Sequence, residues 1–145
     1  MTNEQLAYIA GFVDGEGTIS FHRKSKQNQI SETPRVTPWV SIANNDLIVL
    51  KWIQSEYGGH VSKGRRRQPQ HKVGYQWQLT GIAALYFILD IYLWLKIKTD
   101  QAQIVLRYLY EHPLKKIGRK EGYGEDWWIY VNSLKSQLIE MRKVA

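Results

Sequence analysis

Near the N-terminus, apolar positions first recur at helical spacing and then alternate as in a strand. The pattern predicts a helix from Glu4 to about Val13, with Thr2 or Asn3 as its N-cap. One face of this helix is apolar: Leu6, Ile9, Ala10 and Val13. From Thr18 to Phe21 the period becomes two residues, which predicts a strand with Ile19 and Phe21 on one face. The helix should therefore end near Gly15 and Gly17 and lead directly into a strand.

A second strand, a second helix and a second pair of strands follow in the same way. Alternation from Val36 to Ala43 predicts a strand whose core-facing side chains are Val36, Pro38, Val40 and Ile42. The next helix has Asn44, Asn45 or Asp46 as its cap and ends at Gly58 and Gly59. Its apolar stripe consists of Leu47, Leu50, Ile53 and Tyr57. Further strands are expected from His60 and from about Val73 to Thr80.

The remainder of the chain is expected to be helical. The predicted segments are Gly81 to Leu95, Thr99 to Glu111 and Glu125 to Lys143. The apolar run from Ile82 to Leu95 contains Asp90 and falls short of the roughly 20 residues that a membrane span needs. The order predicts an α+β fold, and since no linker or repeat divides the chain, we expect one domain over residues 1–145.

Composition and charge narrow the class of protein. Of 145 residues, 43% are hydrophobic and 23% are charged, which is typical of a globular chain. Twenty Lys and Arg against thirteen Asp and Glu give a net charge of +7, which favours a polyanionic partner such as nucleic acid. Ribosomal proteins, membrane-surface proteins and many ordinary enzymes are also basic. The chain has no cysteine, and its four histidines, His22, His60, His71 and His112, show no zinc-ligand spacing.

The first helix combines a face of small residues with acidic residues at its end. Ala7, Gly11 and Gly15 recur every fourth residue, so another backbone can approach this face closely. Asp14 and Glu16 lie at the C-terminus, where the helix dipole disfavours carboxylates, so we expect a cationic group to compensate. If two copies of the helix pack together, paired Glu16 carboxylates could bind divalent cations for phosphodiester hydrolysis. Alternatively, the two glycines make a tight turn beside a solvated Glu16.

The segment Ile9-Ala10-Gly11-Phe12-Val13-Asp14-Gly15-Glu16-Gly17 closely resembles the motif of the LAGLIDADG homing endonucleases. The stretch from Leu95 to Ala102 resembles the family segment that carries a basic active-site residue. The resemblance implies an αββαββα fold with a curved antiparallel DNA-binding sheet and an extra C-terminal helix. Because one motif is present, it also implies a homodimer whose interface contains Ala7, Ala10, Gly11 and Asp14.

The same resemblance implies roles for individual site residues. Glu16 matches the acid that binds catalytic Mg²⁺, although many relatives have Asp there, and Gly15 matches a position that lends a backbone carbonyl. Lys98 matches a lysine near the scissile phosphate; alternatively it is a surface lysine. Asn44 matches a residue that organises solvent around the nucleophile; alternatively it is a helix N-cap. Mn²⁺ is expected to substitute for Mg²⁺, and Ca²⁺ to support binding without cleavage.

In the family, strand faces opposite the core lie along the DNA major groove. The corresponding side chains here are Ser20, His22, Lys24, Lys26, Arg35, Thr37, Trp39, Ser41, Ser62, Gln76 and Gln78. Tyr75, Trp77 and Leu79 should point inward, and a register error of one residue would exchange the two faces. Phosphate contacts are expected from the basic residues after His60: Lys63, Arg65, Arg66, Arg67 and Lys72. Alternatively, this basic run is a solvated loop.

The resemblance implies a homodimeric, Mg²⁺-dependent, site-specific DNA endonuclease that cuts a long pseudo-palindromic target and promotes intron or intein homing. An RNA maturase or a non-cleaving DNA-binding protein on the same fold is the alternative, and an accidental motif in a basic structural protein is a third reading. No small-molecule cofactor is expected, because the glycines around Glu16 lack the third glycine of a dinucleotide fingerprint. The N-terminus lacks a signal-peptide pattern, so we expect an intracellular protein with no membrane partner, encoded by an organelle, phage or bacterial genome.

Overall fold

The fold is described here from a computed structural model, which covers residues 1–23, 36–64 and 73–111 together with a few isolated helical residues between 129 and 140. The elements are α1 (Asn3–Glu16), β1 (Gly17–Arg23), β2 (Val36–Asn44), α2 (Leu47–Tyr57), β3 (His60–Lys63), β4 (Tyr75–Thr80), α3 (Gly81–Ile91), the 3₁₀ turn η1 (Tyr92–Trp94) and α4 (Thr99–Glu111). This order confirms the predicted αββαββα arrangement. Most of the helix predicted over Glu125 to Lys143 lies outside the described residues.

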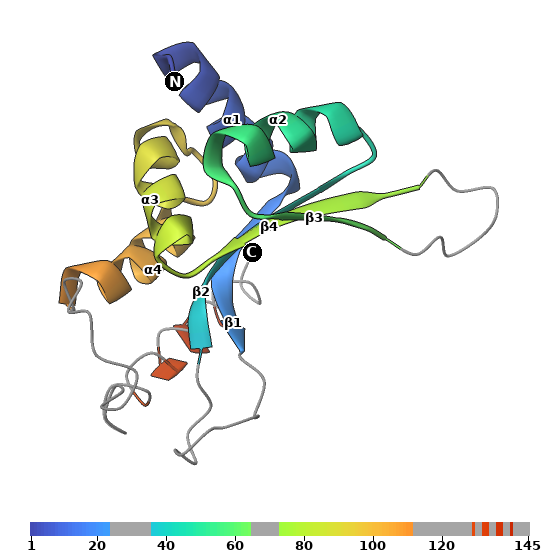
Figure 1. The fold of residues 1–145 in the computed structure, drawn as a ribbon. Coiled ribbons are helices and arrows are strands. Elements are labelled where there is room, and N and C mark those ends of the chain that lie inside the picture. The colour runs from blue at the N-terminus through green and yellow to red at the C-terminus, as the bar shows by residue number, and fades with distance from the viewer. Residues whose placement is uncertain are drawn as a thin grey trace.

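The four strands form one antiparallel sheet in the order β1-β2-β4-β3. Two hairpin-like pairs, β1 with β2 and β3 with β4, meet through the central pairing of β2 with β4. Figure 1 shows that the two pairs extend in different directions and that the helices gather on one side of the sheet. The sheet therefore has a helix-covered face and an outer face.

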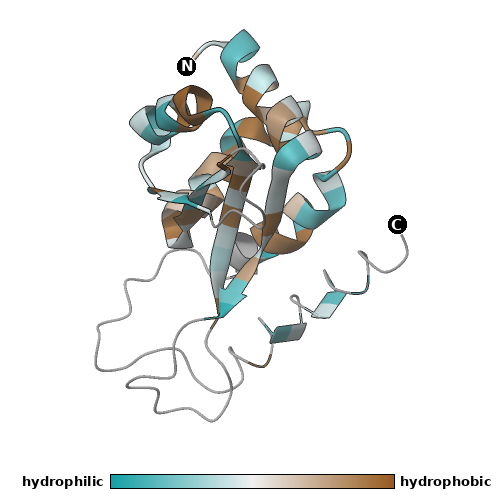
Figure 2. Cartoon of the chain, turned by 90° about the vertical axis from the view of Figure 1, so that its right-hand side faces the viewer, coloured by the Kyte–Doolittle hydropathy of each residue, from teal (hydrophilic) through white to brown (hydrophobic). Residues whose placement is uncertain are grey.

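The hydrophobic core lies between the helices and the sheet (Figure 2). The fully buried side chains Val40, Ile42 and Trp77 come from the sheet. Against them pack residues from the helices that are also buried: Ile9, Val13, Leu50, Ile53, Phe87, Ile88 and Val105. Each large apolar side chain buried in this way contributes about 1.5–3 kcal/mol to stability. The predicted alternation of β1, β2 and β4 is thus in the correct register.

Helix boundaries follow local capping where the capping residue is close in sequence. Thr2 caps α1 in a reciprocal pair with Gln5, and Asp46 caps α2 by accepting from the N–H groups of Ile48 and Val49. The predicted Gly58 and Gly59 end of α2 is also confirmed. Among the described residues, no helix is long and apolar enough to cross a membrane.

One helix end agrees with the prediction and one differs. The first helix runs to Glu16, between the two glycines near which it was expected to end, so the acidic residues belong to its last turn. The third ends at Ile91, where η1 takes over, and Leu95 is extended with φ −67° and ψ 139°. The apolar run continues through this region, so its pattern alone predicts a longer helix. Beyond η1, the backbone N–H groups of residues 96–98 bond to Asp14 at the end of α1.

Candidate functional site

Asp14 joins the end of α1 to the segment that leads into α4. Its carboxylate oxygens accept hydrogen bonds from the backbone N–H groups of Lys96 at 2.8 Å, Ile97 at 3.2 Å and Lys98 at 3.0 Å. The Lys98 ammonium donates in return to the backbone carbonyl of Asp14 at 2.6 Å. Asp14 is only 8% exposed. Lys98 is therefore held against the turn of α1 that ends in Glu16. Lys98 and Glu16, which are both predicted site residues, are thus brought together although they are far apart in sequence.

This junction supplies the cationic compensation that the sequence led us to expect. The last turn of α1 contains no basic residue, so the cation that compensates the partial negative charge of its free carbonyls must come from elsewhere in the chain. The Lys98 ammonium provides that charge, while the Asp14 carboxylate lies just ahead of the N-terminus of α4. The first hydrogen bond of α4 runs from the N–H of Ala102 to the carbonyl of Lys98 at 3.0 Å. Opposite ends of two helix dipoles thus meet at one point.

Gly17 turns α1 directly into β1 and leaves Glu16 exposed at the turn. Its N–H donates to the carbonyl of Val13, and its backbone is extended with φ −99° and ψ 169°. A Cβ atom at this position would lie 2.8 Å from the Val13 carbonyl oxygen, closer than side-chain carbon atoms approach. The backbone therefore needs glycine here because of close approach to the preceding turn. Glu16 and Gly15, the predicted metal ligands, are both exposed.

The oxygen donors at this turn suit a hard divalent cation. The Glu16 carboxylate and a backbone carbonyl such as that of Gly15 are ligands that Mg²⁺ accepts. Within the described residues, however, no group of three His, Cys, Asp or Glu side chains is placed to hold a metal. A cation bound at Glu16 would thus need oxygen ligands beyond those that this part of one chain supplies.

One face of α1 is open. Tyr8, Gly11 and Gly15 are exposed, and a Cβ atom built at either glycine would meet nothing within 4 Å. The predicted interface residue Ala7 is half-buried beside this face. The predictions for Ala10 and Asp14 are wrong: Ala10 is fully buried in the core of its own chain, and Asp14 is engaged with residues 96–98. At 3.6 residues per turn these two positions rotate onto the core side of the helix.

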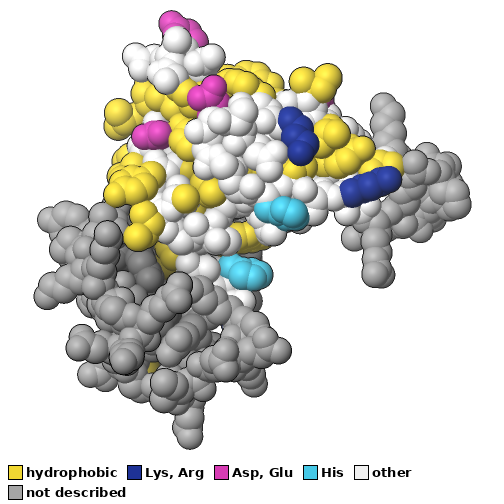
Figure 3. Space-filling view, in the orientation of Figure 1, with side chains coloured by type: hydrophobic (Ala, Val, Ile, Leu, Met, Phe, Trp, Pro, Cys, Tyr) yellow, Lys and Arg dark blue, Asp and Glu magenta, His cyan; other side chains and the backbone are white. Residues whose placement is uncertain are grey.

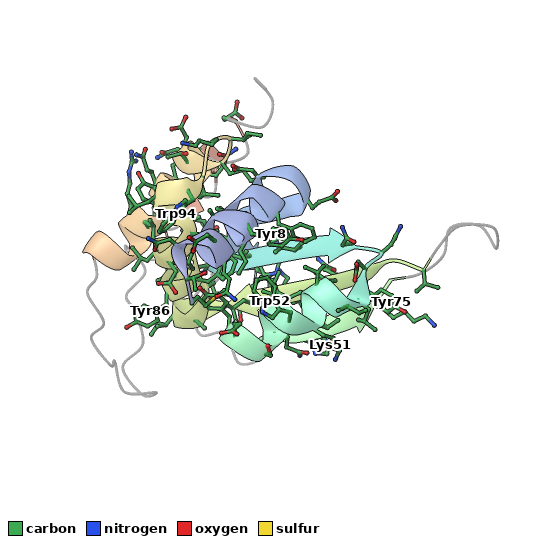
Figure 4. All side chains as sticks on the ribbon, turned by 90° about the horizontal axis from the view of Figure 1, so that it is seen from above. Tyr8, Lys51, Trp52, Tyr75, Tyr86 and Trp94 are labelled. Atoms are coloured by element: carbon green, nitrogen blue, oxygen red, sulfur yellow. The ribbon has the colours of Figure 1, made fainter. Side chains whose placement is uncertain are left out.

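An apolar groove of about 480 Å³ lies beside the open face of α1, between α1 and the start of α2. Figure 4 shows Tyr8 of α1 and Trp52 of α2 on facing helices, and their rings are 6.1 Å apart in an edge arrangement. Ile48, which also lines the groove, is 83% exposed. So large an exposed apolar side chain beside a bare helix face is typical of a protein–protein interface.

The outer face of the sheet carries most of the side chains that were predicted to read DNA. The pairing register places Thr37 opposite His22 and Gln76 opposite Ser62, on the face away from the core. This outer face carries six half-buried or exposed residues: His22, Thr37, Trp39, Ser62, Gln76 and Gln78. Figure 3 shows histidine side chains, together with Lys or Arg side chains, on the surface that is visible in the orientation of Figure 1.

Three residues predicted to contact DNA lie in a different setting from the rest. Ser20 and Ser41 do lie on the outer face, but they are only 8% and 5% exposed. Larger residues stand opposite them, Trp39 beside Ser20 and Gln78 beside Ser41, so the serines line the base of the surface. Lys63 pairs with Tyr75 and therefore points to the other face of the sheet, at the exposed tip of β3.

The register also adds residues that the sequence analysis did not assign to this face. His60 pairs with Gln78, Thr18 pairs with Ser41 and Thr80 pairs with Trp39, so all three share the outer face. His60 and Thr80 are exposed. Alternation counted back from Ser62 identifies His60, so the signal for it was present in the sequence.

Asn44 has a structural partner. Its Oδ1 atom accepts a hydrogen bond from the N–H of Asp46 at 2.7 Å, which closes the turn into α2. Asp46, and not Asn44, is the N-cap of that helix. The remaining predicted DNA contacts lie outside the described residues: Lys24, Lys26, Arg35, Arg65, Arg66, Arg67 and Lys72.

The fold is shared with solved homing endonucleases. I-TnaI matches with a TM-score of 0.67 at 20% identity, covering 91% of this chain and 86% of that one. I-CvuI, crystallised with its target in the presence of Ca, matches with a TM-score of 0.61 at 19% identity and coverages of 90% and 94%. Meganuclease I-SmaMI, crystallised with uncleaveable DNA, matches with a TM-score of 0.65 at 16% identity, covering 90% of this chain and 43% of that one. No curated protein sequence matches at a significant level.

The αββαββα order of this chain and the Gly-acid-Gly turn at the end of its first helix agree with the class of homing endonucleases. The sequence profile of the LAGLIDADG endonucleases matches residues 9–103, which is more than half of the 145 residues. The chain belongs to the LAGLIDADG endonuclease family. It is accordingly a site-specific DNA endonuclease, and the prediction of its family and fold from the motif is confirmed.

Proposed function

We propose that this endonuclease cuts both strands of a long pseudo-palindromic DNA target as a homodimer, with divalent cations held between the two Glu16 carboxylates. The observation that carries the proposal is the junction of α1 with the segment 96–98. It puts the Lys98 ammonium on the turn of α1 that ends in the exposed Glu16, beside the open face of that helix. An acid and a cation are thereby held at the point where a second chain can approach.

Dimerisation through α1 is supported by the shape of the open helix face. Gly11 and Gly15 leave room for close backbone contact, and the neighbouring groove with Tyr8, Ile48 and Trp52 exposes apolar surface that a second subunit would cover. The match to I-SmaMI covers 90% of this chain but 43% of that longer chain. Two copies of this chain would therefore approach the length of that longer chain.

The site residues fit a hydrolytic reaction. Glu16 from each chain and the carbonyl of Gly15 would hold Mg²⁺, which when bound activates water and stabilises charge on the phosphate oxygens. The Lys98 ammonium stabilises negative charge that develops at the scissile phosphate. Asn44 keeps its Nδ2 group available for a water molecule while Oδ1 is engaged with Asp46. We expect Mn²⁺ to replace Mg²⁺, and Ca²⁺ to support binding alone.

DNA binding is assigned to the outer face of the sheet. The face presents His22, Thr37, Trp39, Gln76 and Gln78, and amide side chains suit the donor and acceptor pattern of base edges in the major groove. By their charge, we assign phosphate contacts to basic residues that lie outside the described part of the chain: Lys24, Lys26, Arg35, Arg65, Arg66, Arg67 and Lys72. Cleavage at one long target is the activity that promotes intron or intein homing.

The direct test is selection of cleaved sites from a randomised DNA duplex library with Mg²⁺, followed by selection of bound sites with Ca²⁺. We expect one pseudo-palindromic site from both selections. Glu16→Gln should abolish cleavage of the recovered duplex while leaving its affinity in Ca²⁺ unchanged, because a neutral amide binds Mg²⁺ poorly but keeps the same shape.

The matched control is Glu56→Gln, which removes one exposed carboxylate from the last turn of α2. It should cleave at the wild-type rate. Undiminished cleavage by Glu16→Gln would remove Glu16 from the mechanism. Binding of a selected site without any Mg²⁺-dependent cleavage by the wild type would instead favour a non-cleaving DNA-binding protein, and selective binding of intron RNA would favour a maturase.

A further inference from the structure

We infer that Asp14 is a positioning residue for cleavage: its carboxylate fixes the main chain of Lys98 so that the ammonium group stands at the Glu16 end of α1. This inference rests on the proposed function, since it assigns to Asp14 an effect that is exerted through Lys98. Asp14 itself contacts only neighbouring groups of its own chain among these bonds, three backbone N–H groups and the Lys98 side chain, and it is buried.

The Asp14 carboxylate accepts more hydrogen bonds than a side chain that only caps a helix end usually does. Three consecutive backbone N–H groups converge on one carboxylate within 2.8–3.2 Å, and Asp14 is 8% exposed. Hydrogen bonds to a charged acceptor are roughly twice as strong as those between neutral groups. The backbone of residues 96–98 thus has one strongly preferred position relative to α1.

Both restraints on Lys98 come from the same residue. Asp14 Oδ1 accepts from the Lys98 N–H at 3.0 Å, and the Asp14 carbonyl accepts from the Lys98 ammonium at 2.6 Å. The flexible lysine side chain is therefore held at both of its ends by a residue in the last turn of α1. Glu16 belongs to that same turn, so movement of Glu16 and movement of Lys98 are coupled through Asp14.

The coupling affects the cleavage rate because catalysis requires each reactive group to be positioned accurately. Misplacement of a catalytic group by about 1 Å can lower a rate about 100-fold. If the Asp14 carboxylate is removed, residues 96–98 lose their common acceptor and Lys98 can leave the site, although the sheet that binds DNA is unchanged. Loss of Asp14 should consequently lower the cleavage step and spare target binding.

The experiment compares Asp14→Asn with the control Asp90→Asn. Asp90 is also a carboxylate that links two helices, since it accepts a hydrogen bond from the Tyr57 hydroxyl at 2.9 Å, but it lies in α3 and contacts neither Glu16 nor Lys98. The probe is the duplex recovered from the randomised library. We expect Asp14→Asn to lower the single-turnover cleavage rate at least about tenfold with unchanged affinity in Ca²⁺, and Asp90→Asn to cleave at the wild-type rate.

A double-mutant cycle with Lys98→Met separates positioning from general destabilisation. If Asp14 acts through Lys98, adding Asp14→Asn to Lys98→Met should cause little further loss of rate. Equal, additive losses would overturn the positioning role while leaving Glu16 and Lys98 in the mechanism. Full cleavage by Lys98→Met alone would overturn the proposed role of Lys98 and the inference together.

Hydrogen exchange of the wild-type protein keeps the inference testable should Asp14→Asn fail to fold. The amides of Lys96, Ile97 and Lys98 should be protected, and they should stay protected in Lys98→Met, since the acceptor is the carboxylate. Exchange of all three at the rate of an unstructured loop would overturn the inference.

Discussion

The indole Nε1–H of Trp39 donates a hydrogen bond to Oε1 of Gln78 over 3.3 Å. Because an indole N–H is a donor only, it fixes the orientation of the amide, with the oxygen toward Trp39 and the NH₂ group away from it. The two residues lie on adjacent strands, β2 and β4, on the outer face of the sheet. In the proposed complex, Gln78 would therefore offer N–H donors to DNA while its oxygen is engaged with Trp39.

This relationship predicts the base preference of Gln78. A glutamine with a free amide pairs with adenine through a donor and an acceptor together, whereas a fixed donor favours acceptors such as N7 and O6 of guanine. Trp39→Phe removes the indole donor and keeps an aromatic ring. The preference at one position in each half-site should then shift toward adenine by about 1–3 kcal/mol, as measured by selection from the randomised library.

The control for this shift is Gln78→Ala, which should remove the preference at that position. Adding Trp39→Phe to Gln78→Ala should change nothing further, because the acceptor is gone. An identical site profile for Trp39→Phe and the wild type would show that the indole does not set the orientation of Gln78 on DNA.

Gly17→Ala is expected to destabilise the fold. The added methyl group would lie 2.8 Å from the carbonyl oxygen and 2.9 Å from the Cα atom of Val13, so the backbone must shift. Such overpacking costs about 1–3 kcal/mol in the free energy of unfolding, measurable by urea denaturation. Gly74→Ala is the matched control, since its methyl group would meet its nearest neighbour at an ordinary 3.7 Å. Equal stabilities of the two variants would contradict the close packing of the turn.

Gly11→Leu should weaken dimerisation without unfolding the monomer. The position is open in one chain, with nothing within 4 Å of a Cβ atom, so a leucine side chain fits there. In the proposed dimer the same space is filled by the partner helix, and the leucine would hold the two helices apart. Analytical ultracentrifugation should show a shift toward monomer, while circular dichroism stays like that of the wild type. An unchanged dissociation constant would move the interface away from α1.

Affinity for the target should depend steeply on salt. Each Lys or Arg that neutralises a phosphate adds about 0.9 to the slope of log affinity against log salt concentration. Replacing Arg65, Arg66 and Arg67 with alanine removes three charges from each chain, so the slope should fall by at most about 5 for a dimer. Lys51→Ala removes an exposed charge from α2 and should leave the slope unchanged. Equal slopes for all three proteins would show that the arginines do not contact phosphates.

The sequence predicted those features that depend on neighbouring residues. Strand alternation placed Ile19, Val40 and Trp77 in the core, and apolar periodicity placed α4 from Thr99 to Glu111. The motif identified Glu16 and the family, and the glycine pair after Tyr57 marked the end of α2.

Long-range contacts account for what the sequence did not predict. Asp14 was expected at a subunit interface because the family resemblance implied it, but its hydrogen-bond partners are 82–84 residues away in the same chain. The same long-range contacts hold Lys98 against α1, a position that the helix pattern could not predict. Ser20 and Ser41 were assigned to the correct face, yet their burial depends on the size of residues across the strands, which alternation does not report.

The central claim is that two Glu16 carboxylates share cations between two subunits. A crystal structure of the protein bound to its selected duplex in Ca²⁺ tests this most directly. We predict a two-fold dimer in which Glu16 of both chains coordinates Ca²⁺ at about 2.3–2.6 Å next to the scissile phosphates. Glu16 residues lying tens of ångströms apart, with no cation on either, would contradict the claim.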